Sequence, residues 1–298
     1  MKKPECRQLS GVRNTNRDII DSMKSKTQAH TGPLEINEEL KIKLRNLADK
    51  YEVPSFTDED PSQFLRWYQP EAGRGSVADV EAASFIAAML AFGSRKQFIP
   101  KIRQILETSD RSLGSLSEWL RAGAYKKDFP HGETKFYRFY SYDDMQVFFG
   151  ELAEVLNTAG SLGEYVRTAV VDAKNTVVEP VETTADISTL ISATFPNSAI
   201  VPKGRSSANK RIHMFLRWMV RRNSPVDLGL WEWADPASLI IPLDVHVMQE
   251  AAKLGLIPEG AAASRKTAEC LTAALAEVFP GDPCRGDFAL FGLGVDVV

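Results

Sequence analysis

The sequence predicts an all-α fold, and three observations support this class. Apolar residues recur every three or four positions through most of the 298 residues, which is the spacing of amphipathic helices. The alternation of apolar and polar residues that is typical of strands is nearly absent. No segment repeats at a fixed length. From the usual length of globular helices we expect about ten to twelve of them.

The first half of the chain is expected to begin with a polar, basic, disordered tail at residues 1–33 and to become helical from Leu34. Asp60-Pro61 predicts a helix start, because Asp caps helices well and Pro favours the first helical position. The segment Val77–Phe92 is apolar on most sides and predicts a buried helix. The same spacing predicts further helices at residues 98–106, 113–120, 143–156 and 162–171.

A segment of different character, FPHGETKFYRFYSY, occupies residues 129–142. Its aromatic side chains lie next to Lys135 and Arg138 and could stack on nucleic-acid bases. Aromatic residues of this kind also serve as partly buried anchors between helices. The sequence leaves both interpretations open.

The second half of the helical region follows residues 175–186, which lack helical spacing and are expected to form a loop or an insertion. Beyond it, apolar spacing predicts helices or short apolar segments at residues 187–195, 203–222, 244–254, 268–279 and 287–293. We expect one helical region, 34–298, with two possible lobes made of residues 34–174 with 256–298 and of residues 187–255.

Composition excludes several classes of protein. Hydrophobic residues make up 44% and charged residues 25% of the chain, as in soluble globular proteins. The longest apolar run, Ala82–Phe92, is far shorter than the ~20 residues that cross a bilayer. The three cysteines do not suffice for a disulfide framework, and the N-terminus lacks the apolar core of a signal peptide. We therefore expect a cytoplasmic protein without membrane contact. The four histidines are scattered along the chain, so we expect no metal site, and we also expect no cofactor.

Positive charge is concentrated in residues 203–222, KGRSSANKRIHMFLRWMVRR, which carry seven Lys and Arg residues in a chain of net charge −3. No Asp or Glu occurs from Ile187 to Val226, whereas exposed helices normally mix charges of both signs. Such a segment favours a polyanion as its partner. Ser206 or Ser207 is placed to cap the helix, whose free N–H groups could then bind a phosphate. A solvated basic face without a partner is the alternative.

A second segment, IIPLDVHVM at residues 240–248, places Asp244 at the start of a helix between apolar residues. Asp244 fits a simple helix N-cap. Alternatively, the apolar neighbours desolvate a carboxylate that the cap holds ionised, which suits proton transfer or stabilisation of a developing cation. A lysine beside such an aspartate can attack an aminal carbon, because its amine forms a Schiff base.

Five segments together resemble an uncharacterised bacterial family of all-helical proteins: DPSQFLRWY, LAFGSRKQ, KGRSSANKRIHMFLRWMVR, IIPLDVHV and DFALFGLG. That family is distantly similar to the helix-hairpin-helix DNA glycosylases, above all to the archaeal 8-oxoguanine glycosylase branch. In that branch a catalytic lysine starts a helix, and a catalytic aspartate follows in a P-x-D-x-[HR]-like context. The resemblance implies a two-lobed helical bundle with a cleft between the lobes.

Transferred residue by residue, the resemblance implies that Lys210 is the catalytic lysine and Asp244 the catalytic aspartate. It implies binding of DNA, damaged duplex above all, by Lys203, Gly204, Arg205, Ser206, Ser207, Arg211, Arg217 and His246. Gln97, Phe136 and Tyr137 are candidates for the pocket of a flipped base. The glycine-rich hairpin of the superfamily is replaced here by KGRSS.

The leading hypothesis is a DNA-repair glycosylase that removes a damaged, for example oxidised, base and that also has lyase activity if Lys210 forms a Schiff base. A second hypothesis is a DNA- or RNA-binding protein that has the same scaffold without catalysis. In a third, the basic helix binds an acidic protein partner.

Overall fold

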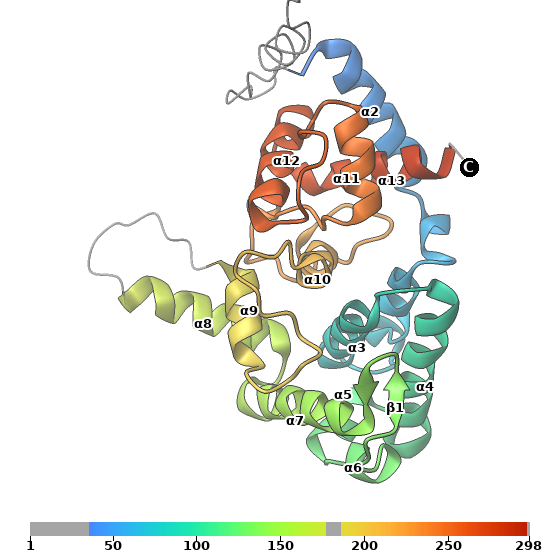
Figure 1. Ribbon diagram of the computed structural model, residues 1–298. Coiled ribbons are helices and arrows are strands. Elements are labelled where there is room, and N and C mark those ends of the chain that lie inside the picture. The colour runs from blue at the N-terminus through green and yellow to red at the C-terminus, as the bar shows by residue number, and fades with distance from the viewer. Residues whose placement is uncertain (1–35, 177–185, 297–298) are drawn as a thin grey trace, which may run out of the picture. The chain divides into compact units, whose positions relative to one another are not determined.

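A computed structural model describes residues 36–176 and 186–296 (Figure 1). The described residues from Ile36 onward form one compact unit. The predicted tail at residues 1–33 and most of the predicted loop at residues 175–186 lie outside the described residues. The division of the helical region into two lobes stays a prediction.

The first part of this unit runs from α2 to α8. Its elements are α2 (Glu38–Tyr51), the 3-10 helices η1 (Pro54–Thr57), η2 (Pro61–Arg66) and η3 (Pro70–Ala72), α3 (Val77–Leu90), α4 (Arg95–Leu113), α5 (Leu116–Arg121), α6 (Tyr125–Asp128), β1 (Lys135–Tyr137), β2 (Tyr140–Ser141), α7 (Tyr142–Ala159) and α8 (Leu162–Thr176).

The second part runs from α9 to α13. Its elements are α9 (Ile187–Thr194), α10 (Lys210–Val220), η4 (Pro236–Ser238), α11 (Val245–Lys253), α12 (Arg265–Val278), η5 (Pro283–Arg285) and α13 (Gly286–Asp296). The described residues thus hold twelve α-helices, which confirms the prediction of a mostly helical protein with about that number of helices.

One small hairpin departs from the all-α prediction. Strands β1 and β2 pair antiparallel within the aromatic segment, with Lys135 opposite Ser141 and Tyr137 opposite Tyr140. Strands of three and two residues are too short to show an alternating pattern in the sequence. Asp60 does cap a helix, since its side chain accepts a hydrogen bond from the Ser62 N–H, but the helix that follows is a 3-10 helix.

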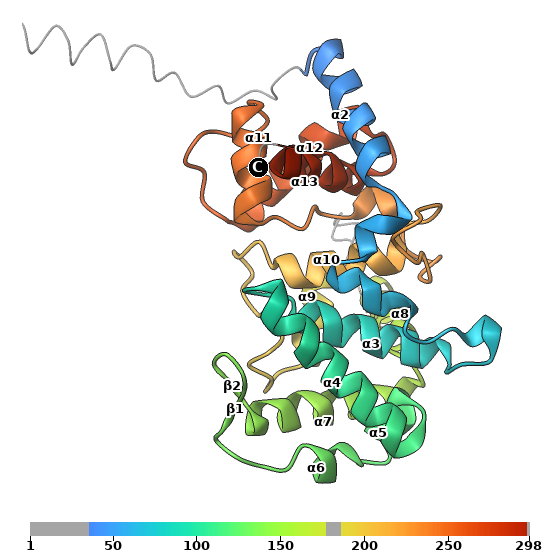
Figure 2. The same ribbon diagram turned by 90° about the vertical axis from the view of Figure 1, so that its right-hand side faces the viewer.

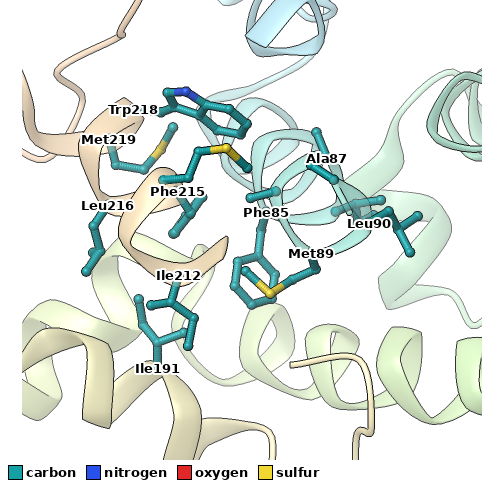
Figure 3. Close-up of a cluster of buried hydrophobic side chains, with 14 of the residues drawn as sticks. Phe85, Ala87, Met89, Leu90, Ile191, Ile212, Phe215, Leu216, Trp218 and Met219 are labelled. Atoms are coloured by element: carbon teal, nitrogen blue, oxygen red, sulfur yellow. The ribbon is translucent and has the colours of Figure 1, made fainter. Parts of the chain in front are cut away.

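Helix α3 lies in the core and fixes the place of α10. A capping box between Ser76 and Asp79 starts α3, and its residues from Ala78 to Leu90 are all buried. Figure 3 shows Phe85 of α3 beside Phe215 of α10, and the centres of these two rings lie 5.1 Å apart. The apolar face of the basic helix is therefore buried against α3, as its spacing predicts.

Helices α2 and α13 pack against each other, so the two ends of the described unit meet (Figures 1 and 2). Gly292 permits this approach, because a Cβ at this position would lie only 2.0 Å from Cδ2 of Tyr51. Arg217 of α10 contacts Asp287 of α13. The basic helix α10 therefore lies between α3 and the C-terminal helices (Figure 1).

Candidate active site

Lys210 is the first residue of α10, and the loop before it has a defined conformation. Asn209 precedes the helix with φ 42° and ψ 41°, in the left-handed region that Asn adopts more readily than most residues. Its side-chain amide donates to the carbonyl of Gly204 at 2.7 Å. The N–H of Arg265 donates to the Ser206 carbonyl at 2.8 Å, which ties the loop to the start of α12. The prediction that Ser206 or Ser207 caps the helix is wrong, because Asn209 occupies the cap position.

Asp244 caps α11, as both interpretations of this residue require. Its Oδ1 accepts the N–H of Val247 at 2.9 Å. The three residues before it are buried, and the N–H of Ile241 donates to Oγ1 of Thr272 at 3.0 Å. The apolar segment IIPL therefore fixes the position of the carboxylate from one side and the helix fixes it from the other.

The structure brings Lys210 and Asp244 together. Nζ of Lys210 lies 2.8 Å from Oδ2 of Asp244, so one carboxylate oxygen caps α11 and the other contacts the amine. The two side chains are 37% and 29% exposed, and a ligand can therefore reach both. Burial pushes the pKa of Asp244 upward, but the charge and hydrogen bond of Lys210, with the Val247 N–H, outweigh burial and leave this pKa below its usual range. Asp244 is thus ionised at neutral pH.

The pair lines a pocket of about 280 Å³. The other residues of its wall come from η1, α4, α10, α11, α13 and the segments between them: Phe56, Asp60, Arg95, Met214, Arg217, Pro242, His246, Val247, Asp287, Phe291 and Gly294. The rings of Phe56 and Phe291 meet edge to face with their centres 4.9 Å apart. The pocket therefore combines an aromatic wall with carboxylates and basic side chains.

Asp287 is a pocket residue that the sequence did not single out. It stands at the start of α13, in the segment DFALFGLG, and its carboxylate contacts the guanidinium of Arg217. Burial raises the pKa of Asp287 to about 6. A carboxyl group that titrates near neutral pH can donate or accept a proton beside Lys210. The resemblance marked this segment, but nothing in the segment distinguishes Asp287 from an ordinary aspartate in a first helical turn.

Arg95 also lines the pocket, and the sequence did not single it out. Its guanidinium Nη2 lies 3.9 Å from Oδ2 of Asp60, and its Cζ lies 5.6 Å from the ring centre of Phe291. The side chain is 46% exposed, so Arg95 provides positive charge at the accessible side of the pocket.

Two residues of the basic segment are buried in ion pairs. Arg217 is 3% exposed, and its Nε lies 3.3 Å from Oδ1 of Asp227. Arg221 is 2% exposed and pairs with acidic residues of three other segments, Glu52, Asp227 and Asp282. The prediction that Arg217 binds nucleic acid is therefore corrected: its guanidinium is a buried part of the pocket wall. Its partners lie outside the segment, so the local charge pattern could not show them.

The loop before α10 holds most of the other predicted DNA-binding residues. Lys203, Gly204, Arg205, Ser206 and Ser207 are all exposed. Nζ of Lys203 donates to the carbonyls of Pro196 and Ser198 at 2.8 and 2.6 Å. Together with Arg265, the first three of these residues line a second hollow of about 260 Å³. This loop therefore presents cations beside the start of α10.

The last two predicted DNA-binding residues, Arg211 and His246, have different environments. His246 is exposed and lines the Lys210 pocket. Arg211 extends away from it: its guanidinium donates to the Met89 carbonyl and lies over the ring of Phe92, with Cζ 5.1 Å from the ring centre.

The predicted base-pocket residues do not line the Lys210 pocket. Phe136 and Tyr137 are 2% and 4% exposed and pack in the core, and the Tyr137 hydroxyl donates to the Phe92 carbonyl. For these two residues the buried-anchor interpretation is correct. Gln97 is exposed in the first turn of α4, outside the pocket wall.

The described part of the chain lacks two kinds of feature. No group of three His, Cys, Asp or Glu side chains is placed there to hold a metal ion. None of the helices in this part combines the length and the apolar character needed to cross a membrane.

Comparison with known protein families covers most of the chain. The family described as "Protein of unknown function (DUF2400)" matches residues 60–296. The chain belongs to this family. The matched region includes Lys210, Asp244 and Asp287 but not Phe56. Comparison with curated proteins gives no match, and neither does comparison with solved structures, so no link to DNA glycosylases comes from them.

In this DUF2400 protein the pocket offers a defined set of chemical groups. An amine contacts an ionised carboxylate, and a second carboxyl group titrates near neutral pH. A deprotonated lysine is a nucleophile, and the carboxylate of Asp244 can stabilise positive charge next to it. The set therefore combines an amine, an ionised carboxylate and a carboxyl group that can transfer a proton.

Proposed function

We propose that the protein is a DNA glycosylase that removes a damaged, for example oxidised, base and that Lys210 also gives it lyase activity. The observation that supports this most is the 2.8 Å contact between Nζ of Lys210 and Oδ2 of Asp244 at an accessible pocket. The proposal includes the two-lobed arrangement of the helix-hairpin-helix glycosylases, a cytoplasmic location and damaged duplex DNA as substrate.

In the proposed reaction, the damaged base is turned out of the duplex into the pocket. The free amine of Lys210 attacks C1′ of the nucleotide, and the bond from C1′ to the base breaks with its electron pair leaving on the base. The base takes up a proton from Asp287, and the new C1′ amine releases one. The bond from C1′ to O4′ then breaks with its electron pair leaving on O4′, which takes up the proton released by the amine, and Nζ of Lys210 and C1′ are joined in a Schiff base.

Asp244 has two roles in this scheme. It holds the Lys210 amine in place through their 2.8 Å contact. It also stabilises the positive charge that develops on the sugar as the base departs. Both roles need the ionised carboxylate, which the low pKa of Asp244 provides.

Aromatic rings in the pocket wall and cations on a nearby loop support binding of a flipped nucleotide. The rings of Phe56 and Phe291 offer an aromatic wall for a flat base. Lys203 and Arg205 lie exposed on the loop that leads into α10, where they can bind backbone phosphates. Such contacts offset part of the free energy needed to flip a base, which amounts to about a few kcal/mol.

A panel of duplex oligonucleotides, each with one damaged base, tests the proposal by measuring base release. We expect release from at least one duplex by the wild type and a loss of about a hundredfold or more in Lys210→Ala and Asp244→Asn. Lys253→Ala is the matched control, because Lys253 forms a similar contact of 2.6 Å with Glu250 on α11, outside the pocket wall.

Other results would favour the other two hypotheses. Tight DNA binding by the wild type with no release from any lesion, and unchanged binding in Asp244→Asn, would contradict catalysis and indicate a nucleic-acid-binding protein. Weak duplex binding with little salt dependence would contradict a DNA function and indicate an acidic protein partner.

A further inference from the structure

The tip of the β1–β2 hairpin carries an exposed aromatic side chain, Phe139. It is 60% exposed, and no other aromatic side chain in the described part of the chain is classed as exposed. The neighbouring aromatic residues Phe136, Tyr137 and Tyr140 are at most 4% exposed. The hairpin thus buries its other rings and leaves this one in solvent.

The ring of Phe139 is held in place by its neighbours. Its centre lies 5.3 Å from the ring centre of Phe92 and 4.6 Å from that of Tyr140. Arg138, the other tip residue, has φ 50°, and its guanidinium carbon lies 5.8 Å from the ring centre of Phe92. A left-handed conformation is uncommon for Arg, and here it turns the chain sharply at the tip. Phe139 therefore projects from a supported position.

The hairpin tip lies close to residues that flank the Lys210 pocket. Nη1 of Arg138 approaches Gly93 so closely that a Cβ there would lie 2.3 Å from it. Gly93 is two residues before Arg95, which lines the pocket. Phe92 also contacts Arg211, the residue after Lys210, with Cζ of Arg211 5.1 Å from the ring centre. The exposed ring and the proposed nucleophile are thus linked through Phe92 and Arg211.

Five basic residues lie in the hairpin tip and its neighbours. Residues 92–101 and 134–142 contain Arg95, Lys96, Lys101, Lys135 and Arg138, while the acidic residues Glu133, Asp143 and Asp144 adjoin the base of the hairpin. Nζ of Lys101 lies 4.6 Å from the ring centre of Phe136, which places this lysine against the hairpin. An exposed aromatic ring among cations is the combination that nucleic-acid surfaces use, because cations bind phosphates and rings stack on bases.

We propose that Phe139 is a stacking wedge that enters the DNA duplex beside the target nucleotide and fills the space left by the flipped base. This inference rests on the proposed function. Apolar side chains that insert between base steps unstack them, and an aromatic ring replaces part of the lost stacking. The wedge and the Lys210 pocket would act on the same nucleotide from neighbouring positions.

The test uses the full chain, a lesion-containing duplex and the corresponding single strand. Phe139→Ala should lower base release from the duplex by about tenfold to a hundredfold and leave release from the single strand nearly unchanged. Phe139→Tyr, which keeps a ring, should retain most of the duplex activity. Leu113→Ala is the control, because Leu113 is a 50% exposed apolar residue at the other end of α4.

A second readout keeps the inference separate from the proposed function. A duplex with 2-aminopurine at the target position reports unstacking as a rise in fluorescence when the protein binds. We expect the rise for the wild type and Phe139→Tyr and its loss in Phe139→Ala. If the wild type releases no base at all, the proposed function fails. In that case the fluorescence measurement alone tests whether Phe139 acts as a wedge. Equal duplex release or an equal fluorescence rise in Phe139→Ala, or no duplex binding by the wild type, would overturn the wedge.

Discussion

Residues of the same type within the basic segment have different environments. Lys210 lines the pocket at 37% exposure, Arg205 is exposed, and Arg217 and Arg221 are buried among carboxylates. The charge pattern predicted one basic surface, because it compares each residue only with its neighbours in sequence. Buried arginines need partners, and here these come from distant segments such as Glu52 and Asp287. Charge in a sequence therefore indicates a surface only after such partners are known.

His213 gives a prediction at the residue scale. It is 2% exposed, and neither ring nitrogen has a hydrogen-bond partner among the described residues. Burial, and then the charge of Arg265, lower the pKa of His213 to about 4. In the unfolded chain the His213 side chain takes up a proton with a pKa near 6.5. The folded state therefore loses stability as the pH falls from about 6.5 towards 4.

The expected loss from His213 alone is about 3 kcal/mol of unfolding free energy by pH 4. Urea denaturation at a series of pH values measures it as the difference between the wild type and His213→Leu. If the unfolding free energy fell equally steeply with pH in both proteins, His213 would be shown to be protonated in the folded state.

At the scale of elements, the sequence predicted most helices and both residues of the Lys210–Asp244 pair. Helical spacing is a local property, so α3 and the start of α11 at Asp244 could be predicted. The local pattern did not give the start of α10, although the resemblance implied a helix starting at Lys210, because Asn209 caps the helix in a left-handed conformation that a hydrogen bond to Gly204 supports. The role of Asp287 in the pocket depends on how α13 packs beside α10, which no local pattern contains.

The packing of α2 against α13 gives a prediction at this scale. A Cβ at Gly292 would overlap the ring of Tyr51, whereas a Cβ at Gly294 would meet nothing within 4 Å. We expect Gly292→Ala to lower the unfolding free energy by about 1–3 kcal/mol. Gly294→Ala should instead raise it by up to about 1 kcal/mol, because Ala favours the helix. Denaturant unfolding of both variants measures these changes. Similar unfolding free energies for Gly292→Ala and Gly294→Ala would contradict the packing described for Gly292.

At the scale of the whole molecule, an acidic protein is proposed to bind a polyanion. The net charge is −3, so binding depends on the local cations of the loop before α10 and of the hairpin. Arg217 and Arg221 do not add to this surface, since their charges are neutralised in buried ion pairs. The described residues thus suggest fewer phosphate contacts than the seven cations of the segment would allow.

Salt dependence of duplex binding measures this surface. The logarithm of the affinity should fall linearly with the logarithm of the salt concentration, and Lys203→Ala with Arg205→Ala should reduce the slope by about two. Lys253→Ala is again the control, because Lys253 lies outside both the Lys210 pocket and the loop before α10. A slope that does not change in the double variant would show that this loop does not contact phosphates.

The central claim is that Lys210 is the nucleophile of a DNA glycosylase, and borohydride trapping tests it most directly. The protein is incubated with duplexes that carry an abasic site or a damaged base, and borohydride reduces any Schiff base to a stable amine. The account predicts a covalent complex with the wild type, attachment to the peptide that contains Lys210, and no complex with Lys210→Ala. Absence of a complex with the wild type on every duplex, or attachment to another residue, would contradict it.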